Sequence, residues 1–358
     1  MLDIPAHTAG RRPLLLREPL HRSSLSAESL DFQVRVGRPD PSERGPQTPC
    51  VLVLTRTADR EIDELSLALA AAGVPILRLD SDRAPDHDLC WDPRAGVVIA
   101  DGAALRPVVC WSRYFTAGSI PVASADAALA AYARAQWSAA TGALAATPGV
   151  RHVNPAPAPD RLAQLDAARA AGLATPATVV TNAPAEALRW LPGHGDVIVK
   201  SVGEHFVEPR AGELTGLTPR RLSRAQLAAE AQREPAPVIV QEFLGSAREL
   251  RVYAVGGRLC SFAVAKPSLS ALWDGGQELV VEEIPTPPSL EAPLRRLLRR
   301  WDLDVAAFDF LATPNGPVFL EVNPACDWLW CERRAGVAHV GAAVRGLVET
   351  AYRREVAA

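Results

Sequence analysis

The chain has 358 residues, a formal net charge of −3 and 48% hydrophobic residues. A chain of this length is expected to form two or three compact lobes around a sizeable core. The near-neutral charge provides no basic field for a nucleic acid, so we expect no nucleic-acid partner. No apolar run approaches the length of a signal peptide or a membrane span, and the six cysteines include no C-x-x-C pair. These features predict a cytoplasmic protein in a reducing compartment, with no membrane partner.

The first 48 residues differ in composition from the rest of the chain. They are rich in Arg, Pro and Ser and show no sustained apolar periodicity. Such a composition predicts a mobile N-terminal extension at residues 1–48.

A small, mostly parallel α/β lobe is predicted for residues 49–150. A strand, a helix and a second strand follow one another from Cys50, and Gly73 stops the helix. The first turn lacks the glycines of a dinucleotide site, which argues against a Rossmann cofactor. The expected elements are strands at 51–54, 74–79, 97–99 and 108–111 and helices at 59–72 and 124–145.

A second region is predicted for residues 151–356, and the whole order of elements indicates an α/β (α+β) protein. Asp160 is a suitable N-cap for a helix that Gly172 closes. Residues 201–218 contain three glycines and little apolar periodicity, so we interpret them as a flexible loop. The other expected elements are strands at 177–181, 196–200 and 238–241, a hairpin at 249–265, and helices at 290–301 and 337–354.

A β-hairpin at residues 308–324 is the most informative stretch of the sequence. Two apolar runs flank a Pro-Asn-Gly turn. A three-residue loop, with its glycine left-handed, would place Asp309 opposite Glu321 and put Asn323 on the same face, whereas a two- or four-residue loop would separate the carboxylates. All three side chains are hard oxygen ligands of the kind that Mg²⁺ binds. The alternative is a partly exposed hairpin with solvated acids.

This hairpin resembles that of the ATP-grasp ligases. In that family an Asp on one strand, and a Glu and an Asn two apart on the next, hold Mg²⁺ on the phosphates of ATP. The resemblance implies that Asp309, Glu321 and Asn323 are the metal ligands. It also implies an ATP-grasp fold behind a pre-ATP-grasp lobe, with a nucleotide cleft between about residues 176–245 and 246–356.

Residues of the expected nucleotide site follow in the family's order. Lys200 ends an apolar strand before a glycine-containing loop, and the resemblance implies that it contacts the nucleotide. Glu249 matches the acid that accepts hydrogen bonds from the ribose hydroxyls. Each residue also has an ordinary interpretation: Lys200 as a solvated lysine at the end of a strand, and Glu249 as a partner of Arg251 in a local salt bridge. The segment that resembles the adenine-reading hinge is Gln241, Glu242, Phe243 and Leu244.

Three basic residues are expected to act on phosphate or on the acceptor. Arg251 shares a strand face with Glu249 and would point at phosphate or at the acceptor carboxylate. Arg161 stands where the family has an early lysine; it keeps the charge but changes the geometry. Relatives also carry a basic segment where this chain has Trp273-Asp274-Gly275-Gly276, so Lys266 is the expected source of the missing charge.

Within the superfamily, the chain is most similar to the peptide-maturing branch that makes graspetides such as microviridins, over about residues 50–355. The branch carries a more basic motif around Ser112-Arg113-Tyr114, so leader recognition is expected to differ here. The resemblance implies an ADP-forming ligase that activates a peptide carboxylate as an acyl phosphate and forms ester or amide cross-links in a ribosomal precursor peptide. A leader-bearing precursor and a possible homodimer are the implied partners. The segments that carry this similarity are 109–113, 164–168, 175–182 and 321–330, the last with its Trp-Leu-Trp.

Two other functions stay open on the sequence. One is a different ATP-grasp carboxylate–amine ligase, which adds amino acids to a protein or a small acid. The other is a catalytically inactive protein that binds ATP and a peptide. Phosphate release with free amino acids would favour the first alternative, and ATP binding without ADP formation would favour the second.

Overall fold

A computed structural model describes residues 47–100, 102–155, 159–203, 206–210, 213–216, 219–229, 236–245, 248–266 and 279–358. Nearly all of the predicted N-terminal extension and the whole of the segment 273–276 lie outside the described residues.

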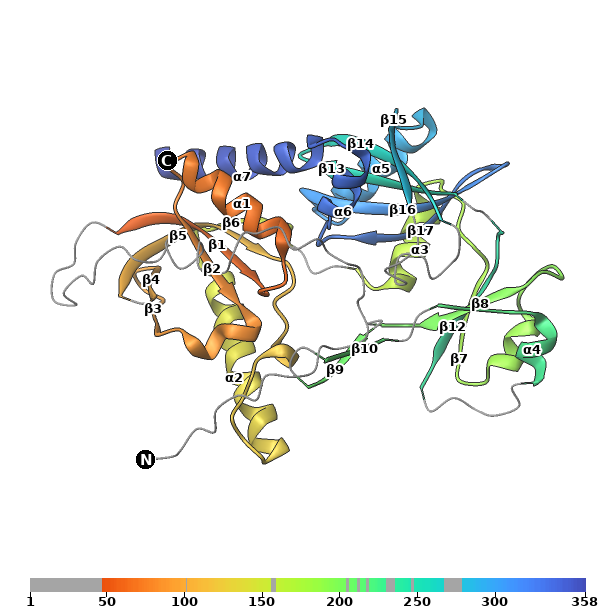
Figure 1. Ribbon diagram of the computed structural model, residues 1–358, viewed down its shortest axis with the longest axis horizontal. Coiled ribbons are helices and arrows are strands. Elements are labelled where there is room, and N and C mark those ends of the chain that lie inside the picture. Colours follow the sequence, from red (N-terminus) through yellow and green to blue (C-terminus); the bar gives the residue numbers. More distant parts are fainter. Residues whose placement is uncertain are drawn as a thin grey trace.

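The N-terminal lobe is built on a six-stranded sheet (Figure 1). Its first strand, which has a parallel neighbour on each side, is buried from Cys50 onward, with Cys50 to Val53 fully inaccessible to solvent, as expected for a parallel strand covered on both faces. The predicted parallel order is confirmed around this strand, while two added strands run antiparallel. In sheet order the strands are β2 (Ile76–Asp80), β1 (Thr48–Thr55), β5 (Ala103–Ser112), β4 (Val97–Ala100) and β3 (Leu89–Asp92), and β6 (Arg151–Val153) also pairs with β5.

The two α-helices of this lobe are confirmed, although the second begins at Ala127 rather than at 124. Asp59 accepts a hydrogen bond from the Ile62 backbone N–H at the start of the first helix, and Gly73 takes a φ of +71° just after its end. The second long helix extends away from the body of the lobe (Figure 1). The elements are α1 (Arg60–Ala71), α2 (Ala127–Ala145) and the short 3₁₀ helices η3 (Ser81–Asp86) and η4 (Ala117–Ser119).

In the part of the chain that follows, the described residues form two larger antiparallel sheets and one two-stranded sheet. The first has the order β11 (Arg220–Leu222), β8 (Val197–Ser201), β12 (Val238–Glu242) and β7 (Thr178–Thr181). It packs against η5 (Pro184–Arg189) and α4 (Arg224–Ala229), through the fully buried Ala187 and Leu227.

The predicted loop at 201–218 is partly wrong, because it contains a two-stranded antiparallel hairpin. The strands are β9 (Phe206–Arg210) and β10 (Glu213–Gly216), close to η4. Backbone pairing between two strands requires no alternation of apolar side chains, so the hydrophobic pattern gave no sign of it.

The second sheet is the larger one and separates two cores. Even-numbered residues of its central strand, such as Leu250 and Val252, face the helices α3 (Arg161–Ala170) and α5 (Pro288–Arg300). Odd-numbered ones, such as Arg251 and Tyr253, face the opposite way, as the two-residue period requires. The sheet order is β15 (Val280–Ile284), β14 (Arg258–Ala265), β13 (Arg248–Val255), β16 (Val305–Thr313) and β17 (Gly316–Asn323).

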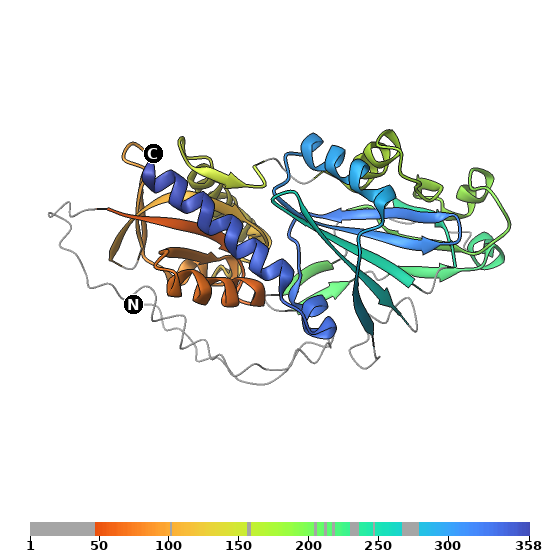
Figure 2. The same ribbon diagram turned by 90° about the horizontal axis from the view of Figure 1, so that it is seen from above.

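The chain ends by returning to the N-terminal lobe. After α6 (Leu329–Ala335), the long helix α7 (His339–Ala357) crosses from the second sheet over the first lobe (Figure 2). Val340, Val344 and Val348 form its buried stripe, and all three have no exposed surface. One core therefore joins the N-terminal sheet to the second sheet. None of the helices that the structure describes has the length and apolar character needed to cross a membrane.

Candidate active site

The hairpin of β16 and β17 places Asp309 directly opposite Glu321, as predicted, but by a different route. Its loop has two residues rather than three, because Thr313 pairs with Gly316. A β-bulge then accommodates Leu320 as an extra residue and shifts the register by one. The predicted three-residue loop is therefore wrong, and the bulge is what brings both carboxylates to one face.

The bulge also explains how a carboxylate can lie within this apolar strand without entering the core. Phe319 and Val322 both enter the core beneath the sheet and are almost completely buried. Residues three apart would lie on opposite faces of a regular strand, and the extra residue returns them to one face. Glu321 consequently lies on the other face, and Asn323 follows it there by the two-residue period.

Arg251 is the direct partner of Asp309. It lies opposite Asp309 on β13 and donates from Nη1 to both carboxylate oxygens, at 2.8 and 3.0 Å. Burial raises the pKa of Asp309 to about 7; Arg251 acts to lower it, while Glu321, Glu249 and Asp327 act to raise it. Asp309 is therefore buried among other carboxylates, with Arg251 as its direct cationic partner.

The same guanidinium has further partners that the sequence did not indicate. Its Nη2 donates to Asp327, and its Nε donates to the Tyr253 hydroxyl at 2.9 Å. The Trp330 ring lies 5.5 Å from the guanidinium carbon. Asp327 belongs to the run that resembles the family, but nothing in its position after β17 indicated that it would turn back to Arg251.

Arg161 and Lys200 lie on the other side of Glu321. Arg161 donates from Nε to Glu321 at 3.2 Å and from Nη1 to the carbonyls of Ser201 and Gly203, at 3.0 and 2.9 Å. Burial lowers the pKa of Lys200 to about 8; Glu321 acts to raise it and Arg161 acts to lower it. The structure thus brings two predicted cations together beside a predicted metal ligand.

The predicted adenine hinge begins within β12, whose last two residues are Gln241 and Glu242. Gln241 is buried and donates from Nε2 to the Thr178 hydroxyl at 2.8 Å. The backbone N–H groups of Glu242 and Phe243 are already used, by the carbonyls of Ala177 and Asp196. The following N–H, that of Leu244, finds no acceptor among the described residues, so it is the donor of this segment that remains for an adenine edge.

Glu249 and Lys266 form an ion pair where β13 and β14 lie side by side. Both side chains are largely buried, with Lys266 only 11% exposed. Glu249, the predicted ribose acceptor, and Lys266, the predicted phosphate cation, are therefore bound to each other. A nucleotide that contacts both side chains must break this ion pair.

Asp309, Glu321 and Asn323 offer two carboxylates and an amide to a metal ion. Across the described part of the chain, no three His, Cys, Asp or Glu side chains are grouped as a metal site. Hard oxygen donors of this kind suit Mg²⁺, which takes few protein ligands and completes its shell with water and phosphate. The residues present therefore fit this ion.

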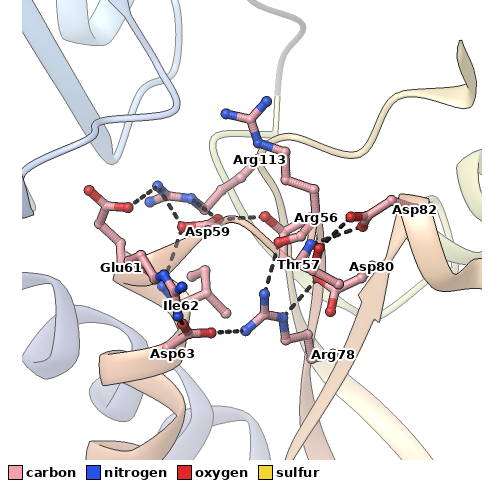
Figure 3. Close-up of polar contacts among 12 residues, drawn as sticks. Arg56, Thr57, Asp59, Glu61, Ile62, Asp63, Arg78, Asp80, Asp82 and Arg113 are labelled. Atoms are coloured by element: carbon pink, nitrogen blue, oxygen red, sulfur yellow. Dashed lines mark hydrogen bonds and ion pairs between the residues drawn. The ribbon is translucent and has the colours of Figure 1, made fainter. Parts of the chain in front are cut away.

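A second polar cluster lies in the N-terminal lobe, at the ends of β1 and β5 (Figure 3). The Arg113 side chain is fully buried, donates from Nε to Asp59 at 3.0 Å, and has its Nη2 3.9 Å from Glu61. Burial raises the pKa of Glu61 to about 7; Arg113 acts to lower it, while Asp59 and Asp327 act to raise it. Glu61 also accepts a hydrogen bond from the Leu329 backbone N–H at 3.2 Å. Arg113 is therefore part of the contact between lobes.

The geometry agrees with comparisons to known proteins. No protein-family model matches the sequence, and no curated protein matches it. Solved structures do match it. The macrocyclase MdnC from Microcystis aeruginosa MRC, bound with precursor peptide MdnA, is 22% identical with a TM-score of 0.71, over 84% of this chain and 99% of that chain.

Two further solved structures are similar over comparable lengths. The RiPP-associated ATP-grasp ligase of Chryseobacterium gregarium, in complex with ADP and a leader and core peptide, is 20% identical with a TM-score of 0.69, over 85% of this chain and 97% of that chain. The ATP-grasp ligase PsnB, complexed with precursor peptide PsnA2 and AMPPNP, is 22% identical with a TM-score of 0.65, over 87% and 100%. The chain therefore has the ATP-grasp fold, preceded by an N-terminal α/β lobe, as its sequence predicted.

Proposed function

We propose that the chain is an ATP-dependent ligase that activates a side-chain carboxylate of a ribosomal precursor peptide and joins it to a hydroxyl or an amine. The observation that carries this proposal is the pairing of Asp309 with Glu321, surrounded by the cationic side chains of Arg251, Arg161 and Lys200. Two facing acids among three cations are the arrangement expected around a metal-bound polyphosphate.

Each residue has a defined part in this proposal. Asp309, Glu321 and Asn323 would hold Mg²⁺, which when bound neutralises phosphate charge. Lys200 and Arg251 donate to phosphate oxygens, and burial strengthens these contacts because water competes less. Glu249 accepts hydrogen bonds from the ribose, and the hinge backbone contacts the adenine. The remaining cations in the proposal are Arg161 and Lys266.

The proposed reaction has two steps and needs no protein nucleophile. A substrate carboxylate oxygen attacks the γ-phosphorus of ATP, the bond to the bridging oxygen breaks, and ADP leaves. A hydroxyl or amine of the acceptor then attacks the carbon of the acyl phosphate, loses its proton and expels inorganic phosphate. Such transfers depend on positioning and on charge neutralisation, which the surrounding side chains provide.

A peptide substrate is favoured by the similar solved structures. MdnC is bound with its precursor peptide, and the Chryseobacterium ligase with a leader and a core peptide. In this chain Arg113 is buried between the lobes, so leader recognition here would use other residues. All six cysteines are free thiols, which supports a cytoplasmic reaction. The homodimer stays a prediction.

The test uses purified chain, Mg²⁺, ATP and the acid-rich peptides encoded by small reading frames beside the gene. We expect ADP and a peptide product lighter by one water for each bond formed, measured by mass spectrometry. Glu321→Gln removes the charge at nearly constant shape and is expected to abolish both signals. ADP formation with free amino acids but no peptide would contradict the proposed substrate, and nucleotide binding without ADP would indicate an inactive binding protein.

A further inference from the structure

We infer that Asp327 is a positioning residue that, together with Tyr253, holds the Arg251 guanidinium in place when Asp309 turns from Arg251 to the metal ion. The inference rests on the proposed function, because it assigns a role in the same site. It concerns a residue to which the sequence assigned no role and which the expected ligand set does not include.

The contacts of Arg251 divide into two sets on different edges of the guanidinium. Among the described residues, Nη1 is used by Asp309 alone, at 2.8 and 3.0 Å. Nε and Nη2 are used by Tyr253 and Asp327. If Asp309 leaves to bind a cation, only Nη1 loses its acceptors, and the other two nitrogens keep theirs. Arg251 can then donate from Nη1 to a phosphate oxygen, and its side chain does not need to reorganise.

Tyr253 and Asp327 form one connected unit behind Arg251. The Tyr253 hydroxyl accepts from Arg251 Nε at 2.9 Å and donates to the Asp327 backbone carbonyl at 2.8 Å, so its single proton is committed. Burial raises the pKa of Tyr253 well above its usual value, against the opposing effect of Arg251, so the hydroxyl keeps the proton that this contact needs. The Tyr253 side chain itself is fully buried and therefore fixed.

The backbone before Asp327 takes an uncommon conformation to bring it back to this point. Cys326 has a φ of +56°, in the left-handed region that residues other than glycine seldom occupy, and its N–H donates to the Asn323 carbonyl at 3.2 Å. The turn starts at a predicted metal ligand and ends at the partner of Arg251. Backbone strain of this kind is characteristic of functional sites.

Charge explains why a carboxylate is useful at this position. Arg251 would lose a charged partner when Asp309 binds the metal, and a buried guanidinium without a carboxylate is costly. Asp327 keeps that charge paired. Its side chain is 37% exposed, so the ion pair adds little to the stability of the fold, and removing it is expected to affect the site more than the folding.

The experiment measures nucleotide affinity rather than turnover. The dissociation constants for the Mg²⁺ complex of AMPPNP and for AMP are determined by titration calorimetry, and the melting temperature is recorded for each variant. We expect Asp327→Asn to weaken AMPPNP binding about tenfold, the scale of about 1.4 kcal/mol for one lost ionic contact, with AMP affinity and melting temperature nearly unchanged. Asp327→Glu restores the charge and should recover part of the loss. Asp166→Asn, an exposed aspartate that also pairs with an arginine, is the matched control.

A double variant tests whether Asp327 acts through Arg251. Arg251→Lys removes the fork that Asp327 holds, so Asp327→Asn should add less than about twofold in that background. An equal loss in both backgrounds, an unchanged AMPPNP affinity, or a parallel loss for AMP with a lowered melting temperature would each overturn the inference. A parent protein that binds no AMPPNP would instead overturn the proposed function, and the inference with it.

Discussion

Arg161 connects the predicted metal site to the loop that follows β8. Its Nε binds Glu321 and its Nη1 binds the backbone carbonyls of Ser201 and Gly203. Because the same guanidinium neutralises Glu321 and orders the start of the loop, its charge matters more than its planar shape.

Arg161→Ala is therefore expected to slow ADP formation roughly 10²-fold or more, the scale for removing one preorganised charge. Arg161→Lys should retain much of the activity, because it keeps the charge that Glu321 and the phosphates need. Initial rates of ADP release measure the activity of both variants. Arg169→Ala, an exposed arginine on the same helix, serves as the control. Unchanged rates in Arg161→Ala would show that other groups hold the phosphates.

Lys200 is a buried ammonium whose nearest charges are Glu321 and Arg161. A lysine contacts phosphate as a compact point charge, and the longer, planar guanidinium does not fit the same space. Both Lys200→Ala and Lys200→Arg are thus expected to weaken ATP binding about tenfold or more, as for the loss of one charge-assisted hydrogen bond. Calorimetric titration measures the affinity, and the exposed Arg189→Ala is the control. If both variants bind ATP like the parent, Lys200 has no part in the site.

The bulged strand β17 depends on its neighbours for support. The Val322 backbone N–H donates to the Gln164 side chain at 2.9 Å, and the Phe319 N–H donates to the Ala174 carbonyl at 2.8 Å. Both bonds attach the strand to the segment around α3, on either side of the extra residue. The register that aligns Asp309 with Glu321 is therefore maintained from outside the hairpin.

Gln164→Ala is expected to destabilise the fold by about 1–3 kcal/mol, because it leaves the buried Val322 N–H without an acceptor. The free energy of unfolding from urea titrations measures this loss. The control is Gln136→Ala on the exposed face of α2, where no change beyond about 0.5 kcal/mol is expected. A loss of no more than about 0.5 kcal/mol in Gln164→Ala would mean that water replaces the Gln164 oxygen as the acceptor for the Val322 N–H.

Elements with strong local signals could be predicted from the sequence, and those fixed by distant contacts could not. The buried run at Cys50 to Leu54 and the cap at Asp59 belong to the first kind. The bulge belongs to the second, because its only trace in the sequence is the three-residue spacing of Phe319 and Val322. The facing carboxylates were predicted correctly from an incorrect loop. The contact between Asp327 and Arg251 depends on a left-handed residue and on a strand far away in sequence, so no local pattern could reveal it.

The contact between the two lobes contains a buried acid that responds to pH. The pKa of Glu61 is about 7, above its usual value of 4.5, so the folded state holds this proton more tightly than the unfolded chain does. The stability gained from protonation is present at low pH and is lost as the pH rises from about 4.5 to about 7.

Glu61→Gln should remove this pH dependence. The parent is expected to lose stability between about pH 5 and about pH 8, and the variant is not. The free energy of unfolding of the variant should therefore rise relative to that of the parent over this range, by at most ~3 kcal/mol. Urea titrations at the two pH values measure it. Glu64→Gln on the same helix, where the side chain is 44% exposed, should follow the parent. Parallel curves for Glu61→Gln and the parent would contradict a raised pKa.

The return of α7 has a consequence for the order in which the protein matures on the ribosome. The N-terminal sheet is translated first, yet part of its core consists of Val340, Val344 and Val348 from near the end of the described chain. Contacts this distant in sequence form late, because the loop between them must close first. We expect nascent chains halted before His339 to keep the first lobe open to added protease, and chains that include the helix to protect it. Protection of chains that lack α7 would show that the first lobe folds without this helix. If α7 is required, the N-terminal lobe completes its folding only after the C-terminal helix has been made.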